Sequence, residues 1–188
     1  TLDMDITSGE IEKAIRKLKS GKACGYDNIC NEVLKSRHLL HSLLGLFQVC
    51  FKTSMIPSDW NRIIIKPIPK KGKDSRIPGN TRGINLLSNI AKLYTSVLND
   101  RLRNYLENDI LHDKQSAYRN GRNCMDNVLI LTTLVRQRRR QKLDTYVCYV
   151  DFSRAFDNIN HTLLLRKLLD MNISDAFIRV IKSIYSNM

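Results

Sequence analysis

Apolar side chains recur every three or four residues along much of the chain, a spacing typical of amphipathic helices. Thr7 or Ser8 is placed to cap a first helix that ends at Gly21, and a second helix is predicted over residues 31–52. The predicted buried stripe of the second helix is Val33, Leu34, Leu40, Leu43, Leu44, Phe47 and Phe51.

The second half of the chain carries further helical patterns. Ser88 is placed to cap a long amphipathic helix that reaches Tyr105, and another helix is predicted over residues 125–140. The apolar side of the predicted 125–140 helix is Val128, Leu129, Leu131 and Val135. A leucine-rich helix is predicted to start at residues 158–160, and residues 177–185 keep helical spacing up to the end of the sequence.

Two extended stretches predict a hairpin. Residues 60–68 are β-branched and apolar, with Pro67 and Pro69 near their end, which is typical of an edge strand or a hairpin strand. Residues 82–87 are a second short extended piece. The basic loop between them, residues 70–80, contains glycine and proline among its charges and is predicted to be mobile.

A third extended stretch, residues 146–150 (YVCYV), has no polar alternation. This pattern predicts a central strand that is buried on both faces. The predicted class is therefore α+β: a helix-rich protein with a short antiparallel sheet.

Charge adds the first functional information. The chain has 31 Lys and Arg against 18 Asp and Glu, a formal net charge of +13. Most of the excess lies in residues 62–82 and 136–142. Clustered cations gain by displacing counterions from a phosphate backbone, so a polyanion is the expected partner. For residues 136–142 alone, the favoured interpretation is a solvated surface or a weak nuclear-import signal, because such runs are common.

The sequence excludes some other classes. No apolar run approaches the length of a membrane span, and no secretory leader opens the chain. Five cysteines without a C-x-x-C pair indicate free thiols in a reducing compartment. We expect an intracellular protein, in the nucleus of a eukaryotic host. Because residue 1 is not Met and the last residues are mid-pattern, we also expect a fragment of a longer chain.

Candidate chemistry gathers where the predicted central strand ends, in the stretch YVDFSRAFD. A carboxylate at the end of a buried strand, here Asp151, suits a Mg²⁺ ligand, and Phe152 can add its backbone carbonyl. The turn at residues 153–155 offers successive N–H groups to phosphate oxygens, and Phe156 adds a flat ring for a sugar. The alternative is structural, since acids often end strands; for Asp157, helix-start capping is the favoured role.

Four blocks of the sequence, in one order and spanning nearly the whole chain, resemble reverse transcriptases of non-LTR (LINE-type) retrotransposons. Residues 151–161 (DFSRAFDNINH) are similar to motif A of that family. The other similar blocks are residues 22–29 (KACGYDNI), 68–70 (IPK) with 80–87 (NTRGINLL), and 115–118 (QSAY) with 121–122 (GR).

The resemblance implies part of a right-hand polymerase, with residues 1–143 as a fingers-like region and residues 144–188 as the start of the palm. It implies an RNA-directed DNA polymerase that uses Mg²⁺, or Mn²⁺ in its place. The implied partners are an RNA template, a DNA primer and deoxynucleoside triphosphates (dNTPs), with no membrane.

The resemblance also implies roles for single residues. Asp151 would be the catalytic residue and, with the carbonyl of Phe152, a metal ligand. Phe156 would exclude a ribose 2′-hydroxyl. The dNTP would be bound by Lys70, Arg82, Arg154, Ala155 and Phe156. The predicted nucleic-acid contacts are Lys71, Lys73, Asn85, Gln115, Arg119 and Arg122.

One part of the family pattern has no match. The paired aspartates of the family do not occur by residue 188, and one aspartate cannot hold two catalytic ions. We therefore predict that this chain alone does not polymerise. Two alternatives stay open: a non-enzymatic nucleic-acid-binding remnant of a retroelement, and a group II intron maturase, which the 22–29 and 80–87 blocks fit less well.

Overall fold

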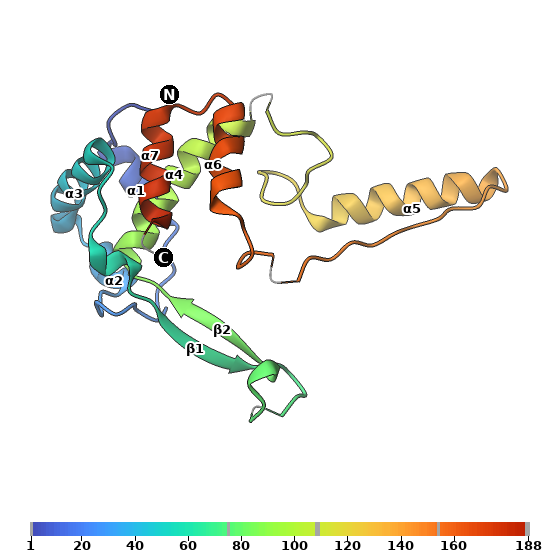
Figure 1. Cartoon of the computed structure of the whole chain (residues 1–188), viewed down its shortest axis with the longest axis horizontal. Coiled ribbons are helices and arrows are strands. Elements are labelled where there is room, and N and C mark those ends of the chain that lie inside the picture. The colour runs from blue at the N-terminus through green and yellow to red at the C-terminus, as the bar shows by residue number, and fades with distance from the viewer. Residues whose placement is uncertain (1, 75, 108–109, 154, 187–188) are drawn as a thin grey trace. The chain divides into compact units, whose positions relative to one another are not determined.

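The computed structural model describes residues 2–74, 76–107, 110–153 and 155–186. They form two units: Thr1–Leu102 with Leu165–Met188, called unit 1, and Arg103–Leu164, called unit 2 (Figure 1). Each unit is described by itself.

The first helix of unit 1 begins as its sequence predicts. In α1 (Ser8–Arg16), Thr7 is the N-cap: its hydroxyl accepts a hydrogen bond from the Glu10 N–H, and the Glu10 carboxylate accepts one from the Thr7 N–H. This reciprocal pair is a capping box, which satisfies two N–H groups that a helix start leaves open. The helix ends at Arg16, earlier than predicted, and Gly21 instead takes a left-handed φ of 68° in the following turn.

The single helix predicted over residues 31–52 is wrong. The chain forms α2 (Asn31–Leu34), the 3-10 turn η1 (Arg37–Leu39) and α3 (Leu40–Thr53), with Ser36 extended between the first two. Polar side chains explain the break, because Glu32 accepts a 2.6 Å hydrogen bond from the Gly21 N–H and Asn31 donates one of 2.8 Å to the Lys19 carbonyl. These bonds tie α2 to the turn after α1, and Val33 of the predicted stripe is exposed.

Aromatic side chains form the centre of unit 1. Phe47 of α3, Trp60 of the 3-10 turn η2 (Ser58–Asn61) and Tyr94 of α4 (Asn89–Glu107) lie with ring centroids 5.1 to 6.2 Å apart. Phe177 of α7 (Asp175–Tyr185) packs edge-on against Phe51, with 6.2 Å between centroids. Truncating a buried aromatic side chain typically costs about 3–5 kcal/mol, so each ring of this cluster contributes substantially to the stability of the unit.

An arginine joins the chain's first residues to α4. Arg101 directs all five of its N–H groups at acceptors: two at the Glu10 carboxylate and three at the backbone carbonyls of Leu2, Met4 and Asp5. Only 9% of the Arg101 side chain is exposed. A lysine has three donors on one nitrogen and cannot reproduce this arrangement.

The predicted hairpin is confirmed. Strands β1 (Ile64–Pro69) and β2 (Thr81–Leu86) pair antiparallel, with Ile64 opposite Leu86 and Pro69 opposite Thr81, and the turn η3 (Pro78–Asn80) leads into β2. The hairpin extends away from the helices of unit 1 (Figure 1). Every residue of β1 is exposed, so the hairpin is not covered along its length.

Unit 2 differs from its sequence prediction. Helix α5 (Cys124–Arg140) forms, and Asn123 caps it by accepting hydrogen bonds from Met125 and Asp126, but none of its residues is buried. Its predicted apolar side is largely exposed, with Leu129 67% accessible. An apolar helix face is buried only where another element packs against it, and within the described part of unit 2 the apolar face of α5 is largely open to solvent.

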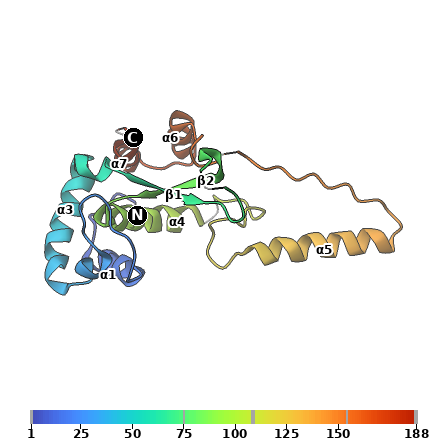
Figure 2. The same ribbon diagram turned by 90° about the horizontal axis from the view of Figure 1, so that it is seen from below.

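The central strand predicted over residues 146–150 is also wrong. This segment is irregular, Tyr146 is 92% and Val150 75% exposed, and Figure 2 shows it running apart from α5 over most of its length. A strand needs a neighbouring strand for its N–H and C=O groups, and the only sheet among the described residues is the β1–β2 pair.

The leucine-rich helix α6 (His161–Asp170) forms as predicted, and its start is capped by Asn160, which accepts a hydrogen bond from the Leu163 N–H. The fold is therefore helix-rich with one short antiparallel sheet, consistent with the α+β class. Among the described residues, no helix has both the length and the apolar character that a bilayer crossing requires.

Candidate functional site

The hairpin sorts its side chains into two faces. Successive residues of a strand point to opposite faces, so Lys66 and Ile68 share a face, and the register places Arg82, opposite Ile68, on that same face. Lys70 directly follows the end of β1, and the hydrogen bond from its N–H to the Asn80 carbonyl continues the pairing by one position. Asn85 lies on the other face, beside Gly83 and opposite Ile65. Of the hairpin residues predicted for nucleotide and template, Lys70 and Arg82 are thus brought together and Asn85 is separated from them.

Lys66 is a candidate that the sequence prediction missed. It is exposed and lies opposite Ile84, two positions along β1 from Ile68 and four from Lys70. The spacing of Lys66 and Lys70 was a usable signal, because residues i and i+4 of a strand always share a face.

The loop end of the hairpin is ordered by internal hydrogen bonds. The Lys70 N–H donates to the Asn80 carbonyl over 2.8 Å and its ammonium to the Gly79 carbonyl over 2.9 Å. Asn80 donates to the Asp74 carbonyl, and Arg76 forms an ion pair with Asp74 over 3.4 Å. The Lys70 side chain is thus bonded to the loop backbone, and the predicted mobility of the loop stays a prediction.

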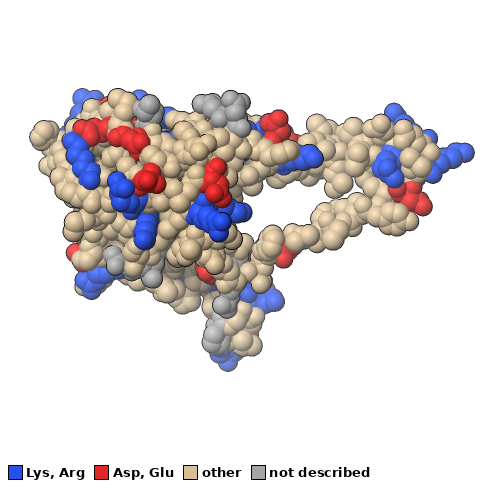
Figure 3. Space-filling view, turned by 45° about the horizontal axis from the view of Figure 1, so that its top comes forward, with Lys and Arg blue, Asp and Glu red and all other residues tan. Residues whose placement is uncertain are grey.

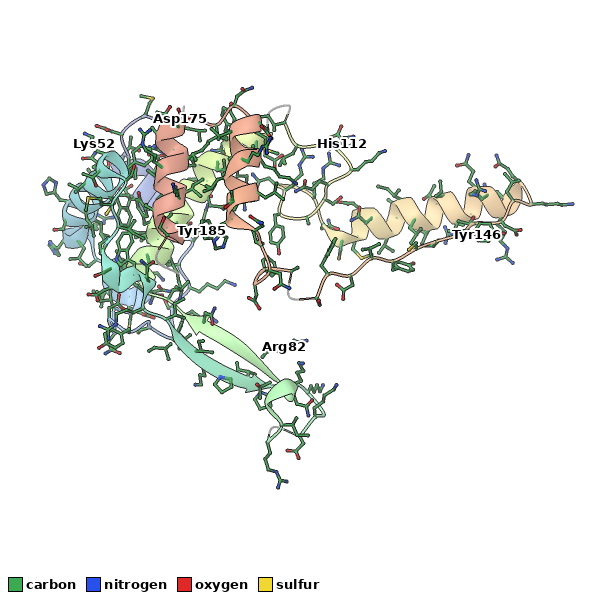
Figure 4. The ribbon with its side chains drawn as sticks, in the orientation of Figure 1. Lys52, Arg82, His112, Tyr146, Asp175 and Tyr185 are labelled. Carbon is green, nitrogen blue, oxygen red and sulfur yellow. The ribbon has the colours of Figure 1, made fainter. Side chains whose placement is uncertain are left out.

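Cations are exposed at this end of the hairpin. Figure 4 shows Arg82 on β2 near the loop, and Figure 3 shows Lys and Arg side chains gathered where the hairpin projects. Lys71 and Lys73 lie in the loop and are exposed. An exposed cluster with a net positive charge attracts a polyanion over about a Debye length, roughly 8 Å at physiological salt.

The Asp151 loop of unit 2 forms an open hollow of about 480 Å³, lined by Asp151, Phe152, Ser153, Ala155 and Asn158. Asn158 donates a 3.1 Å hydrogen bond to the Ser153 carbonyl and so holds the loop closed on itself. Asp151 and Ala155 are exposed. Arg154, predicted to meet the triphosphate, lies outside the described residues.

Two rings flank this loop. Phe156 and Tyr118 meet edge to face, with 6.4 Å between centroids, although both are more than 70% exposed. Exposed aromatic faces of this kind can stack on a base or a sugar. The predicted sugar-sensing ring is thus accessible.

The described residues do not complete a magnesium site by themselves. Among them, no group of three or more His, Cys, Asp and Glu side chains is close enough to hold a metal ion. Asp151 offers one exposed carboxylate, whereas Mg²⁺ takes a near-octahedral set of oxygens and two-metal sites need several acids. Asp151 fits one ligand of such a site and not the whole.

The 112–122 segment holds its predicted template residues in different ways. Arg119 is only 8% exposed, and its guanidinium donates to Glu107 over 3.1 and 3.2 Å and to the His112 carbonyl over 3.2 Å. The hydrogen bond from the Asn120 N–H lowers the pKa of Glu107; burial raises it, but Arg119 lowers it further. A template contact by Arg119 would have to break this buried pair, so its geometry favours a structural role.

Gln115 and Arg122 remain accessible. Gln115 is exposed, while Arg122 forms a 3.2 Å ion pair with Asp113, whose side chain is 88% exposed. An ion pair this exposed is worth about 0–1 kcal/mol, so Arg122 can exchange Asp113 for a phosphate at little cost.

Comparison with known proteins gives one consistent result. Residues 68–188 match the reverse transcriptase (RNA-dependent DNA polymerase) family. The protein named "Probable RNA-directed DNA polymerase from transposon BS" of Drosophila melanogaster is 32% identical over 163 residues, which are 85% of this chain and 18% of that protein.

Two further relatives agree. "Transposon TX1 uncharacterized 149 kDa protein" of Xenopus laevis is 28% identical over 99% of this chain and 14% of its own length. "Retrovirus-related Pol polyprotein from type-1 retrotransposable element R2" of Popillia japonica is 28% identical over 91% of this chain and 23% of its own length. The chain thus spans less than a quarter of these relatives, and it belongs to the reverse transcriptase family in the form carried by non-LTR retrotransposons.

Proposed function

We propose that this chain is part of an RNA-directed DNA polymerase, which copies an RNA template by adding deoxynucleotides to the 3′ end of a DNA primer. The observation that supports this most is the family match, because residues 68–188 include both the Lys70 and Arg82 face of the hairpin and the Asp151 loop. Phosphoryl transfer depends mainly on positioning the phosphates and neutralising their charge, which suits these two elements.

In this proposal the hairpin face binds the triphosphate of the incoming nucleotide. Arg82 presents a planar fork that can bind two phosphate oxygens at once, while Lys66 and Lys70 act as point charges. Lys71 and Lys73 contact the nucleic-acid backbone, and Asn85, on the opposite face, contacts the template. The separation of the two faces lets one hairpin serve nucleotide and template together.

The metal and sugar roles are proposed for the Asp151 loop of unit 2. Asp151 is one ligand of Mg²⁺, with the Phe152 carbonyl beside it, and the bound ion would neutralise charge on the reacting phosphates. The backbone N–H of Ala155 donates to a phosphate oxygen, and the ring of Phe156 meets the sugar and excludes a 2′-hydroxyl. Because no group of three or more His, Cys, Asp and Glu side chains gathers among the described residues, we propose that the chain is inactive without the rest of the parent protein.

Primer extension on an RNA template by the full-length protein tests these roles. Arg82→Ala should raise the KM for dNTP about 10- to 100-fold, since a charge-assisted hydrogen bond contributes roughly 1.5–3 kcal/mol. The KM of Arg82→Lys should lie between those of the wild type and Arg82→Ala, because lysine keeps the charge but has no planar fork. The matched control is Arg76→Ala, since Arg76 is exposed in the loop and paired with Asp74. Equal effects of Arg76→Ala and Arg82→Ala would contradict the assignment.

The acid and the ring are tested in the same assay. Asp151→Asn should reduce synthesis by at least about a thousandfold while leaving RNA binding intact, because it removes a metal ligand without changing shape. Phe156→Val should allow ribonucleotides to be added. Retained synthesis by Asp151→Asn would remove this residue from the metal site.

A salt series separates the polymerase from a non-enzymatic binding module. RNA affinity should fall steeply with salt, and replacing Lys71 and Lys73 with Ala should reduce the slope by about one per lost phosphate contact. A full-length protein that binds RNA in this way but never extends a primer would support the binding module instead.

A further inference from the structure

The turn at residues 25–29 contacts the hairpin where it joins the rest of unit 1. The turn is closed by a hydrogen bond from the Asn28 N–H to the Gly25 carbonyl, 3.2 Å, and by one from the Ile29 N–H to Asp27, 3.1 Å. Asn28 takes a left-handed φ of 55°, a conformation that asparagine adopts more readily than most residues. The turn is therefore a defined structure and not a loose connection.

At the end of β2 the turn meets backbone. A Cβ atom on Gly25 would lie 2.5 Å from the Leu87 carbonyl carbon and 2.6 Å from the Ser88 nitrogen, closer than real Cβ atoms come. The Ser88 hydroxyl donates a 2.6 Å hydrogen bond to Asp27, and the Asn89 amide donates one of 2.8 Å to the Ile29 carbonyl. Ser88 and Asn89 are each only 2% exposed.

The same turn meets the start of β1. The guanidinium carbon of Arg62 lies 3.5 Å from the centroid of the Tyr26 ring, a cation–π contact. Arg62 comes two residues before β1 begins, as Ser88 comes two residues after β2 ends. Neighbouring residues of one turn thus contact both ends of the hairpin where it joins the helices of unit 1.

The hairpin itself has little cover along its length. All of β1 is exposed, and β2 is partly covered only at Thr81 and Leu86. Six residues of strand span roughly 20 Å, so a tilt of about 10° at the base moves the loop end by about 3 Å. A displacement of that size is enough to separate Arg82 from a phosphate that it contacts directly.

We infer that the 25–29 turn is a positioning element: Asp27, through Ser88, and Tyr26, through Arg62, set the direction of the hairpin and so the position of Lys70 and Arg82. The expected effect on the KM for dNTP rests on the proposed function. The expected effect on the direction of the hairpin rests on the contacts alone. Losing either contact lets the hairpin sample other directions, and nucleotide binding then selects the competent one.

This mechanism predicts a particular kinetic pattern. When only a fraction of molecules has the hairpin correctly directed, the apparent affinity for nucleotide is the intrinsic affinity multiplied by that fraction. The rate of synthesis recovers when nucleotide is saturating. In the full-length protein, Asp27→Ala should therefore raise the KM for dNTP about tenfold, the value of a single charged hydrogen bond. Tyr26→Leu should raise it about two- to fivefold, the value of an exposed cation–π contact. In both variants kcat should stay within about twofold of the wild type. Asp27→Asn and Tyr26→Phe are the conservative variants and should restore the KM, because one keeps two hydrogen-bonding atoms and the other keeps the ring.

The direction of the hairpin is measured separately, by the distance between genetically encoded spin labels at positions 73, in the loop, and 49, exposed on α3. We expect one narrow distance distribution in the wild type and in the conservative variants, and a broad one in Asp27→Ala and Tyr26→Leu. Arg101→Lys is the control, since it loosens unit 1 at a site that does not touch the turn.

The outcomes separate a failure of the positioning role from a failure of the proposed function. Unchanged distances in Asp27→Ala and Tyr26→Leu overturn the inference, whatever Arg82→Ala does to synthesis. A fall in kcat with unchanged KM, matching Arg101→Lys, also overturns it, because that pattern reports loss of folded protein. Broadened distances together with normal synthesis by Arg82→Ala support the positioning element and refute the proposed role of Arg82.

Discussion

Glu10 should make the stability of this protein depend on pH in acid. Burial raises the pKa of Glu10, but hydrogen bonds from the Arg101 guanidinium and from Thr7 outweigh it and lower the pKa from 4.5 to about 2. The folded protein therefore releases the Glu10 proton more readily than the unfolded chain does. The resulting stabilisation is fully present above pH 4.5 and is lost as the pH falls towards 2.

The size of this effect follows from the shift. A difference of about 2.5 between folded and unfolded pKa values corresponds to about 3.4 kcal/mol at neutral pH. Since 31% of the Glu10 side chain is exposed, solvent screening reduces this figure to about 2–3 kcal/mol. Glu10→Gln keeps the length of the side chain but removes its charge and, as protonation does, turns one of its two hydrogen-bond acceptors into a donor.

Urea unfolding at a series of pH values from 2 to 7 measures the difference. The free energy of unfolding of Glu10→Gln should lie about 2–3 kcal/mol below the wild type at neutral pH, and the two should converge near pH 2. Glu12→Gln is the matched control, because Glu12 lies on the same helix and forms only an exposed 3.5 Å pair with Arg16. A constant gap between wild type and Glu10→Gln across this range would refute the assignment of the low pKa to Glu10.

Three further outcomes are expected. The Tyr94 hydroxyl is buried without a hydrogen-bond partner among the described residues, so Tyr94→Phe should leave thermal stability unchanged or raise it by up to about 1 kcal/mol; a marked loss would reveal a partner. Burial raises the pKa of the Cys50 thiol, and Cys148 is exposed, so iodoacetamide should label Cys148 before Cys50 in the folded protein, as mass spectrometry of peptides can verify; equal rates would count against the burial of Cys50. Gly25→Ala should lower the free energy of unfolding by about 2 kcal/mol or more, because its Cβ meets backbone, whereas Gly9→Ala, with open space around it, should be neutral or slightly stabilising in the same denaturation experiment.

Local patterns predicted most of unit 1. Thr7 with Glu10 defines a helix start through contacts three residues apart, and the hairpin follows from two extended runs joined by a loop. Both are decided by neighbours in the sequence. The break at Ser36 was not visible, because it results from hydrogen bonds between α2 and the turn after α1.

The errors in unit 2 have a different cause. The apolar run at residues 146–150 shows that the segment favours burial, but it carries no information about which strand would pair with it. Likewise, the sequence presents Arg119 as one more cation, and only the fold reveals that Glu107 binds it. Charge composition predicts that a polyanion binds, whereas only the three-dimensional structure shows which cations form ion pairs within the protein.

The two prolines of β1 have a consequence for how the hairpin meets other chains. Residue 70 bonds inward to residue 80, so residues 65, 67 and 69 direct their backbone groups to the outer edge of β1, and two of these three are prolines without an N–H. An exposed strand rich in isoleucine would normally recruit a second copy edge to edge. Pro67 and Pro69 close that edge, so any strand that extends this sheet must join at β2, and the apolar hairpin can remain in solvent without seeding aggregation through β1.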